Sequence, residues 1–154
     1  MRAVNLGCGL DVRSSENGVE WVNLDIAKLE GVDVVHDLEV RPWPFADGEF
    51  DAVLADDVWE HVDDWRGFMG EVWRILAPGG QAKIRTCAWG VEESFRDPDH
   101  KRWATRETFA YWTPGHWLNE KYPHYADGCG FAEIEARREG DNWVFVLEKL
   151  PEAE

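Results

Sequence analysis

The sequence predicts an α/β domain with a doubly wound, mostly parallel sheet that ends in an antiparallel hairpin. In the first half, short apolar runs alternate with turn residues, as expected of parallel strands that are covered on both faces. One amphipathic helix follows the fourth run, and the final segment holds two strand-like runs around a turn. Because the chain has 154 residues, we expect a single domain over residues 1–154.

Short apolar runs predict four strands before the helix, each followed by glycines or carboxylates. They span residues 3–6, 21–25, 32–35 and 50–55. Such runs are too short for helices and match buried strands in length.

The clearest helix follows the fourth strand. We expect Asp63 to be its N-cap, with Val62 before it as a hydrophobic staple. Its apolar positions recur at spacings of three and four and form one stripe: Trp65, Phe68, Met69, Val72, Ile75 and Leu76. The run Pro78–Gly80 is expected to stop the helix, and residues 81–86 to form a fifth strand.

A tryptophan-rich insert is expected over residues 88–128, where no strand pattern is sustained. It is expected to contain a short helix over residues 105–112 and to serve as core or as a lid over a planar substrate. After it, residues 129–150 predict a hairpin, because alternating runs flank the turn Gly140–Asn142.

Composition and charge exclude several classes of protein. With 44% hydrophobic residues and 10 Trp, the chain is not a disordered acidic tail. A formal net charge of −15 repels phosphate backbones and disfavours bulk nucleic acid as a partner. No apolar run is long enough for a membrane span, and no signal peptide is expected at the start. The three Cys match neither a zinc site nor a disulfide framework, so we expect a cytoplasmic location.

Glycines or carboxylates stand at each of the first four strand ends, where sheets of this kind bind ligands. Gly7, Cys8 and Gly9 follow the first strand, and Asp25 ends the second. A dinucleotide site needs a third glycine where this chain has Val12, and a helix after it. Residues 10–20 are polar and lack helical periodicity. An adenosyl ligand without phosphate therefore fits better, with a carboxylate accepting from its ribose hydroxyls.

Five motifs occur in order between residues 3 and 86. They are Val4–Gly9, Asn23–Asp25, Pro44–Asp51, Glu60–Val62 and Glu71–Gly80. With them the sequence resembles the class I S-adenosylmethionine-dependent methyltransferases of the methyltransferase domain 11 type. The tract Asp97–Arg102 is similar to a stretch in small bacterial and phage members. The resemblance implies a Rossmann-like fold, S-adenosyl-L-methionine as cofactor, and residues 1–87 as the cofactor-binding half.

The resemblance also implies roles for residues at the strand ends. The glycine turn would line the methionine and ribose portion, and Asp25 would bind the ribose hydroxyls. Asp56 would lie beside the methionine end by its backbone or its side chain. Asp37 and Leu38 would flank the adenine. The residues expected to bind the cofactor are Gly7, Cys8, Gly9, Asp25, Asp37, Leu38 and Asp56.

Two histidines are candidates for a general base that takes a proton from the methyl acceptor. His100 has the chemistry of a general base near neutral pH, with a solvated loop as the alternative. His61 is a second candidate base, with fixing the start of the helix as the alternative. No metal site is expected, because Asp97, Asp99 and His100 match no recognised ligand spacing.

The predicted function is S-adenosylmethionine-dependent methyl transfer to a small molecule or another acceptor that is not bulk nucleic acid. The alternative is a binding or interaction domain that holds the cofactor, or S-adenosylhomocysteine, without turnover. A nicotinamide-dependent oxidoreductase is disfavoured by Val12. The sequence indicates neither the acceptor nor an oligomeric state.

Overall fold

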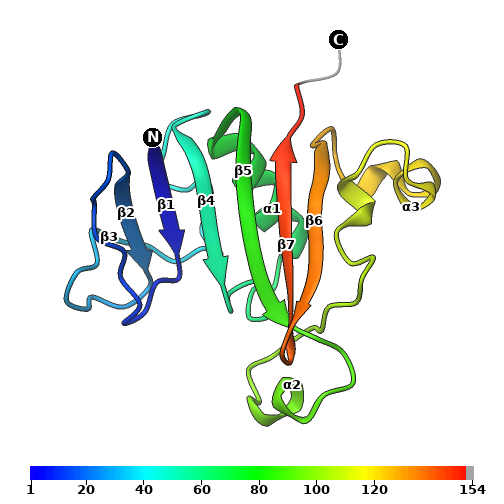
Figure 1. Cartoon of the computed structure of the whole chain (residues 1–154), viewed down its shortest axis with the longest axis horizontal. Coiled ribbons are helices and arrows are strands. Elements are labelled where there is room, and N and C mark those ends of the chain that lie inside the picture. Colours follow the sequence, from blue (N-terminus) through cyan, green and yellow to red (C-terminus); the bar gives the residue numbers. More distant parts are fainter. Residues whose placement is uncertain (152–154) are drawn as a thin grey trace.

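A seven-stranded sheet forms the centre of the molecule in the computed structural model, which describes residues 1–151 (Figure 1). Its strand order is β3-β2-β1-β4-β5-β7-β6. The first five strands are parallel, and β7 is antiparallel to both β5 and β6. The bounds are β1 Arg2–Leu6, β2 Glu20–Asp25, β3 Val34–Val35, β4 Phe50–Asp56, β5 Leu76–Cys87, β6 Phe131–Glu139 and β7 Asn142–Lys149. This arrangement confirms the predicted fold class, including the C-terminal hairpin.

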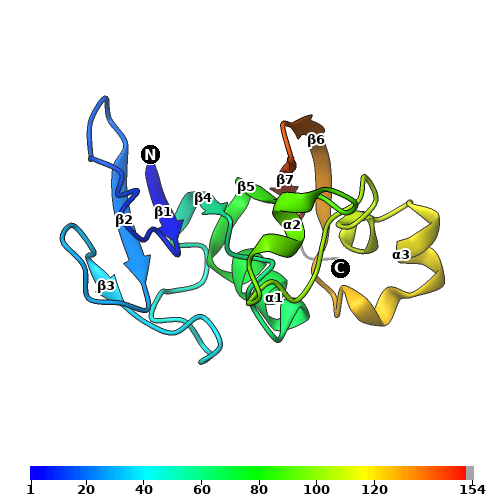
Figure 2. The same cartoon turned by 90° about the horizontal axis from the view of Figure 1, so that it is seen from below.

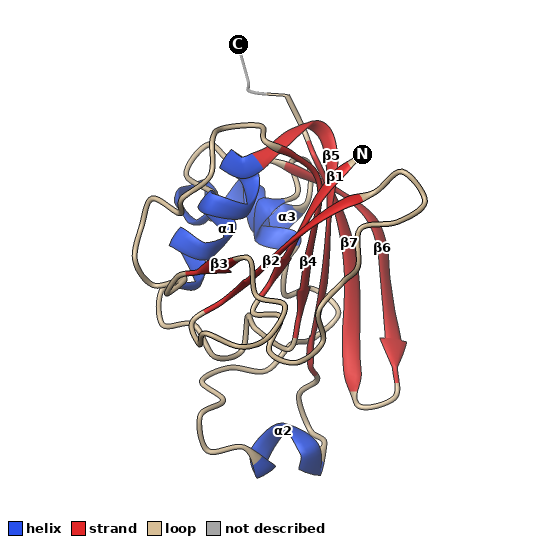
Figure 3. Cartoon of the chain, turned by 90° about the vertical axis from the view of Figure 1, so that its left-hand side faces the viewer, coloured by secondary structure: helices blue, strands red, loops and turns tan. Residues whose placement is uncertain are grey.

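The helices are short, and α1 and α3 lie on the same side of the sheet (Figure 3). They are α1 Trp65–Ile75, α2 Glu92–Arg96 and α3 Trp117–Lys121, with 3₁₀ turns η1 Ala110–Trp112 and η2 Pro123–Tyr125. The small helix α2 lies beyond the carboxyl end of β5 (Figures 1 and 2). No helix within residues 1–151 has the length and apolar character to cross a membrane.

The opposite face of the sheet has no helix packed against it in the described part of the chain. Residues 10–19 connect β1 to β2 without a helix, as their polar sequence predicts. The alternation in β5 reflects this difference, because Ala82 and Ile84 belong to the core while Lys83 is exposed on the other face. The central strand β1 differs, because all of Ala3–Leu6 is buried and the strand is therefore covered on both faces.

The main helix begins one residue later than predicted. Asp64 is the N-cap, and its Oδ1 accepts a hydrogen bond of 2.9 Å from the Gly67 amide. Asp63 instead forms an ion pair with Lys101. The helix ends at Ile75, because the chain turns directly into β5, which includes the Pro78–Gly80 run. Gly79 there has φ +75°, a conformation that favours glycine.

Other local predictions were partly wrong. The expected helix over residues 105–112 is reduced to η1, because its backbone bonds join residues three apart, such as Ala110 to Glu107 at 3.1 Å. The third strand is only Val34–Val35, and the sequence pattern indicated neither α2 nor α3. Helices of five residues carry too little periodicity to be detected.

A charged pair fixes α1 to the chain segment before β4. Glu71 is buried, and its carboxylate accepts from the Trp43 amide at 2.6 Å and from Arg74 Nε at 2.7 Å. Arg74 also donates to the Phe45 carbonyl oxygen at 2.8 Å. Burial by itself raises the pKa of Glu71, but the bonds from Arg74 and Trp43 outweigh it and lower that pKa. The pair therefore positions the helix whose N-terminus lies at the carboxyl edge of the sheet.

Candidate functional site

The turn after β1 requires glycine at its first position. Gly7 has φ +62°, and a Cβ there would lie 2.5 Å from Cγ2 of Val58. Gly9 has φ +50° and open space around it. Asp25, at the end of β2, accepts from the Gly9 amide at 2.8 Å and from the Ala27 amide at 2.9 Å. The glycine turn and the carboxylate predicted to bind ribose are therefore in direct contact.

A cavity of about 470 Å³ lies at the carboxyl ends of β1, β2, β3 and β4, and we call it the acidic cavity. Its lining is Gly7, Leu24, Asp25, Ile26, His36, Asp37, Leu38, Glu39, Asp57, Val58, His61, Val62, Asp63, Asp99 and Lys101. Six of these side chains are carboxylates, and Lys101 pairs with Asp63 at 2.8 Å. Such a wall attracts a cation and repels phosphate.

The predicted cofactor residues differ in where they lie. Gly7, Asp25, Asp37 and Leu38 line the acidic cavity. Cys8 and Gly9 belong to the same turn but not to the lining, and Cys8 is 5% exposed. Burial raises the pKa of the Cys8 thiol, and the nearby Asp25 raises it further.

Asp56 does not line the acidic cavity, whereas its neighbour Asp57 does. Since Val53 and Ala55 of β4 face the core, strand alternation directs Asp56 to the opposite face. There its Oδ2 lies 3.8 Å from Nη2 of Arg13, and burial raises its pKa.

Ile26, Asp57 and Val58 are among the cavity residues that were not predicted to bind the cofactor. Ile26 is 66% exposed beside Asp25, which is unusual for an isoleucine and provides an apolar surface on the cavity wall. Val58 touches the glycine turn, and Asp57 has φ +57°. The signal was present in the sequence, because each lies next to a strand end.

The two predicted histidines come together although they are far apart in sequence. Their ring centroids are 4.8 Å apart. Nδ1 of His61 is 2.8 Å from Oδ2 of Asp99, and Nδ1 of His100 is 2.9 Å from the Ser94 carbonyl oxygen. His100 is thus a hydrogen-bonded wall residue rather than part of a solvated loop, with 12% of its side chain exposed.

A second cavity of about 610 Å³ opens beside these rings, and we call it the histidine cavity. It is lined by Asp57, Glu60, His61, Cys87, Glu93, Arg96, Asp97, His100 and Glu139–Asn142. Burial raises the pKa of the Cys87 thiol to about 11, and Glu60 adds to the shift. Asp57 and His61 border both this cavity and the acidic one.

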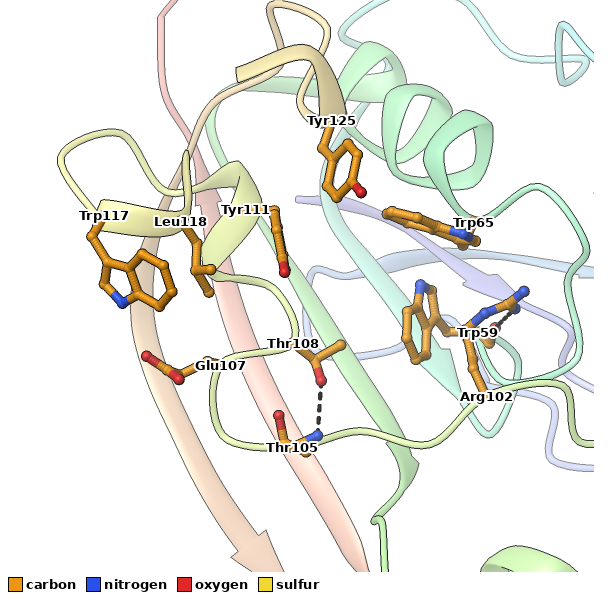
Figure 4. A pocket seen from close by; sticks show the side chains of 10 residues that line it. All are labelled: Trp59, Trp65, Arg102, Thr105, Glu107, Thr108, Tyr111, Trp117, Leu118 and Tyr125. Atoms are coloured by element: carbon orange, nitrogen blue, oxygen red, sulfur yellow. Dashed lines mark hydrogen bonds between the residues drawn. The ribbon is translucent and has the colours of Figure 1, made fainter. Parts of the chain in front are cut away.

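A third cavity, of about 550 Å³, lies between α1 and α3, and we call it the aromatic cavity (Figure 4). It is lined by Trp59, Trp65, Arg102, Thr105, Glu107, Thr108, Tyr111, Trp117, Leu118 and Tyr125. The insert contributes to both core and wall, because Trp112 is 1% exposed and Trp117 is 55% exposed.

Two chain segments separate the three cavities. Residues 57–63 and 97–102 contribute side chains to all of them. The segments are joined by the Lys101 amide, which donates to the Glu60 carbonyl oxygen at 2.8 Å. Arg102 adds a bond of 3.0 Å to the Trp59 carbonyl oxygen and lies over the Trp59 ring. Ligands bound in two neighbouring cavities would therefore be separated only by these two segments.

Comparison with known sequences gives two matches. A family model described as a methyltransferase domain matches residues 6–84, just over half of the chain. The chain is 31% identical over 111 residues to a probable chloroplastic tocopherol O-methyltransferase of Oryza sativa subsp. japonica. That match covers 68% of this chain and 31% of the rice protein, so the chain spans about a third of this curated relative.

Solved structures share the fold at low sequence identity. One is a SAM-dependent methyltransferase from Aquifex aeolicus, with a TM-score of 0.64 and 13% identity, covering 98% of this chain and 82% of that one. Another is the 1,6-didemethyltoxoflavin-N1-methyltransferase of Burkholderia thailandensis with bound S-adenosylhomocysteine. Its TM-score is 0.63 at 12% identity, covering 97% of this chain and 71% of that one.

The sequence match, the strand order and the acidic cavity agree with one another. The glycine turn permits close approach of a ligand, Asp25 offers a carboxylate beside it, and the cavity wall suits a sulfonium cation. The chain therefore belongs to the methyltransferase domain family.

Proposed function

We propose that this chain transfers the methyl group of S-adenosyl-L-methionine to a small-molecule acceptor, with the cofactor in the acidic cavity. The observation that carries the proposal is the contact between the glycine turn and Asp25 on the wall of that cavity. Each Asp25 oxygen accepts one hydrogen bond from a backbone amide. A carboxylate has about four lone-pair sites, so capacity for two ribose hydroxyls is left.

The other cofactor roles follow from position along the same cavity. Asp37 and Leu38 would flank the adenine, and Ile26 supplies an apolar surface for it. Gly7 and Cys8 would contribute backbone near the ribose and methionine portion. For the methionine end, the cavity lining favours Asp57 over Asp56.

When bound, the cofactor supplies a methyl group on a positively charged sulfur, which an acceptor nucleophile takes in one displacement. The protein's part is then to position two reactants and to help the acceptor lose a proton. We assign this help to His61 and His100. His61 borders the acidic cavity, and both residues line the histidine cavity beside it.

A planar small molecule suits the acceptor side best. The aromatic cavity presents Trp59, Trp65, Tyr111 and Tyr125, whose ring faces pack well against flat ligands. The net charge of −15 opposes bulk nucleic acid. The named relatives methylate oxygen in one case and ring nitrogen in the other, so both hydroxyl and nitrogen acceptors belong in a test.

Binding of S-adenosylhomocysteine, measured by calorimetry, tests the cofactor site. Asp25→Ala should weaken binding by about 1–3 kcal/mol, or roughly 5- to 150-fold, because hydrogen bonds to a charged acceptor are lost. Glu30→Ala removes an equal charge from an exposed position outside the cavity lining and should bind as the wild type does. Unchanged affinity in Asp25→Ala would refute the ribose assignment.

Turnover separates the enzyme from a domain that only binds the cofactor. Incubation with methyl-labelled cofactor and a panel of planar hydroxyl and nitrogen acceptors should give a labelled product. Cofactor binding with no labelled product across the panel would favour the binding domain.

All three cysteines are free, and we propose a reducing compartment such as the cytoplasm on that basis.

A further inference from the structure

A buried carboxylate without a cationic partner lies beside the two histidines. Glu60 is 1% exposed. Its Oε2 accepts from the Thr86 hydroxyl at 2.8 Å, and its Oε1 accepts from the Cys87 amide at 3.3 Å. Among residues 1–151, no Lys, Arg or His forms an ion pair with it within 4.0 Å. Buried carboxylates are normally paired with a cation or bound to a metal.

The three side chains converge. One potential ligand atom from each of Glu60, His61 and His100 lies within 4.8 Å of the other two. Ligand bonds of about 2.0–2.2 Å in a tetrahedral site place neighbouring ligand atoms roughly 3.4 Å apart. Closing onto an ion therefore requires shifts of about 1 Å, which side-chain rotation can supply.

Hydrogen bonds fix the tautomer of both rings. The Ser94 carbonyl oxygen can only accept, so Nδ1 of His100 carries the proton in that bond. Asp99 likewise accepts from Nδ1 of His61. In a neutral imidazole the lone pair is then on Nε2, which is the form that binds metal. Histidine ligands in metal sites commonly have such a carboxylate or carbonyl partner on the other nitrogen.

We propose that Glu60, His61 and His100 bind a divalent transition-metal ion at the boundary between the acidic and histidine cavities. Two imidazole nitrogens and one carboxylate suit Zn²⁺ and its first-row neighbours better than Mg²⁺ or Ca²⁺, which prefer oxygen ligands. The histidine cavity leaves an open side for a fourth ligand. Asp99, which the sequence placed near His100, is the partner of Nδ1 of His61. Asp97 lies on the Nε2 side of His100, with its Oδ2 3.9 Å from that nitrogen.

This proposal deepens the proposed function and rests on it for its role. His61 lines the cavity assigned to the cofactor, so an ion here would lie next to the acceptor. With the ion bound, the two rings would help the acceptor lose its proton through the ion and not as bases. A bound cation lowers the pKa of a hydroxyl that it holds. The substrate class that it favours is therefore an acceptor with an ionisable hydroxyl.

Metal titration of chelator-treated protein tests the site without any cofactor present. Co²⁺ should bind at one equivalent and give visible absorption typical of a site with mixed nitrogen and oxygen ligands, and Zn²⁺ should displace it. His61→Ala and His100→Ala should each weaken binding at least tenfold, and Asp99→Asn by roughly 10- to 100-fold. His124→Ala, at an exposed position outside the cluster, should bind as the wild type does.

Glu60→Gln tests the carboxylate while keeping its shape and an oxygen for Thr86, and its thermal melt reports whether it folds. It should weaken Co²⁺ binding as the histidine variants do. No stoichiometric binding by the wild type, or equal binding by the His61 and His100 variants, would overturn the proposal. S-adenosylhomocysteine titration of the same preparations is read separately. Metal binding without cofactor binding would reject the proposed function alone, and the reverse result would reject the metal site alone.

Discussion

The acidic and aromatic cavities are built in different ways. The acidic cavity is formed mainly by residues at or just after the ends of β1, β2, β3 and β4, and carboxylates dominate its polar wall. The aromatic cavity depends on the insert, which supplies Tyr111, Trp117 and Tyr125 from short helices and 3₁₀ turns. Strand ends are held by the sheet, while the insert is held by ring packing such as Trp65 against Trp112, with centroids 5.5 Å apart. If the proposed assignment holds, cofactor recognition is part of the sheet and acceptor recognition is an addition to it.

The largest loss of stability should come from a variant that breaks the buried pair holding α1, which is the support shared by both cavities. Glu71→Ala leaves Arg74 without its main partner and the Trp43 amide without its acceptor. We expect a loss of about 3–4 kcal/mol in the free energy of unfolding, as for breaking one side of a buried pair. Urea denaturation measures it, and both cavities should lose ligand binding together.

The pH dependence of the free energy of unfolding provides a control for this prediction. The pKa of Glu71 is lowered in the folded protein, so its stabilising contribution is present above its ordinary value of 4.5 and is lost as the pH falls through the folded value. Glu71→Ala lacks this contribution, and its stability should fall less steeply than that of the wild type below pH 4.5. Parallel curves would show that the pair contributes nothing.

A smaller effect, confined to the acidic cavity, is expected from the glycine turn. Gly7→Ala combines a strained backbone with a close approach to the stiff Val58 side chain, and should cost about 2–3 kcal/mol. Gly9→Ala has similar backbone strain but open space, and should cost about 1 kcal/mol. Equal losses of stability in the two variants would contradict the packing argument.

The smallest effect on stability should come from the aromatic cavity. Trp117 is 55% exposed, so Trp117→Ala should change stability by less than about 1 kcal/mol. It should leave the affinity for S-adenosylhomocysteine unchanged and raise the KM of a planar acceptor several-fold. A loss of cofactor affinity in this variant would show that the two cavities are not separate.

Sequence reasoning was most accurate where periodicity and strand ends determine the structure. The strands β1, β2 and β4, the helix α1 and the position of Asp25 all follow from local patterns, because a buried face repeats every two or about 3.6 residues. The resemblance placed Asp56 beside the methionine end by its backbone or its side chain. The side chain faces away from the acidic cavity, and the role of the backbone stays a prediction.

The sequence does not predict that Glu60 and His61 lie close to His100. The two segments approach through the Lys101 amide and Arg102, whose backbone contacts carry no recognisable pattern in the sequence. The insert was unpredictable for a related reason, since its five-residue helix α3 is stabilised by tertiary contacts and not by its own periodicity.

Backbone-amide NMR during titration with S-adenosylhomocysteine tests the division between the two cavities most directly. We predict large shift changes at Gly7, Gly9, Ile26 and Leu38, with the Trp117 indole signal unmoved. Shifts concentrated at Trp117 and its neighbours in the insert, with the glycine turn silent, would contradict the assignment of the cofactor to the acidic cavity.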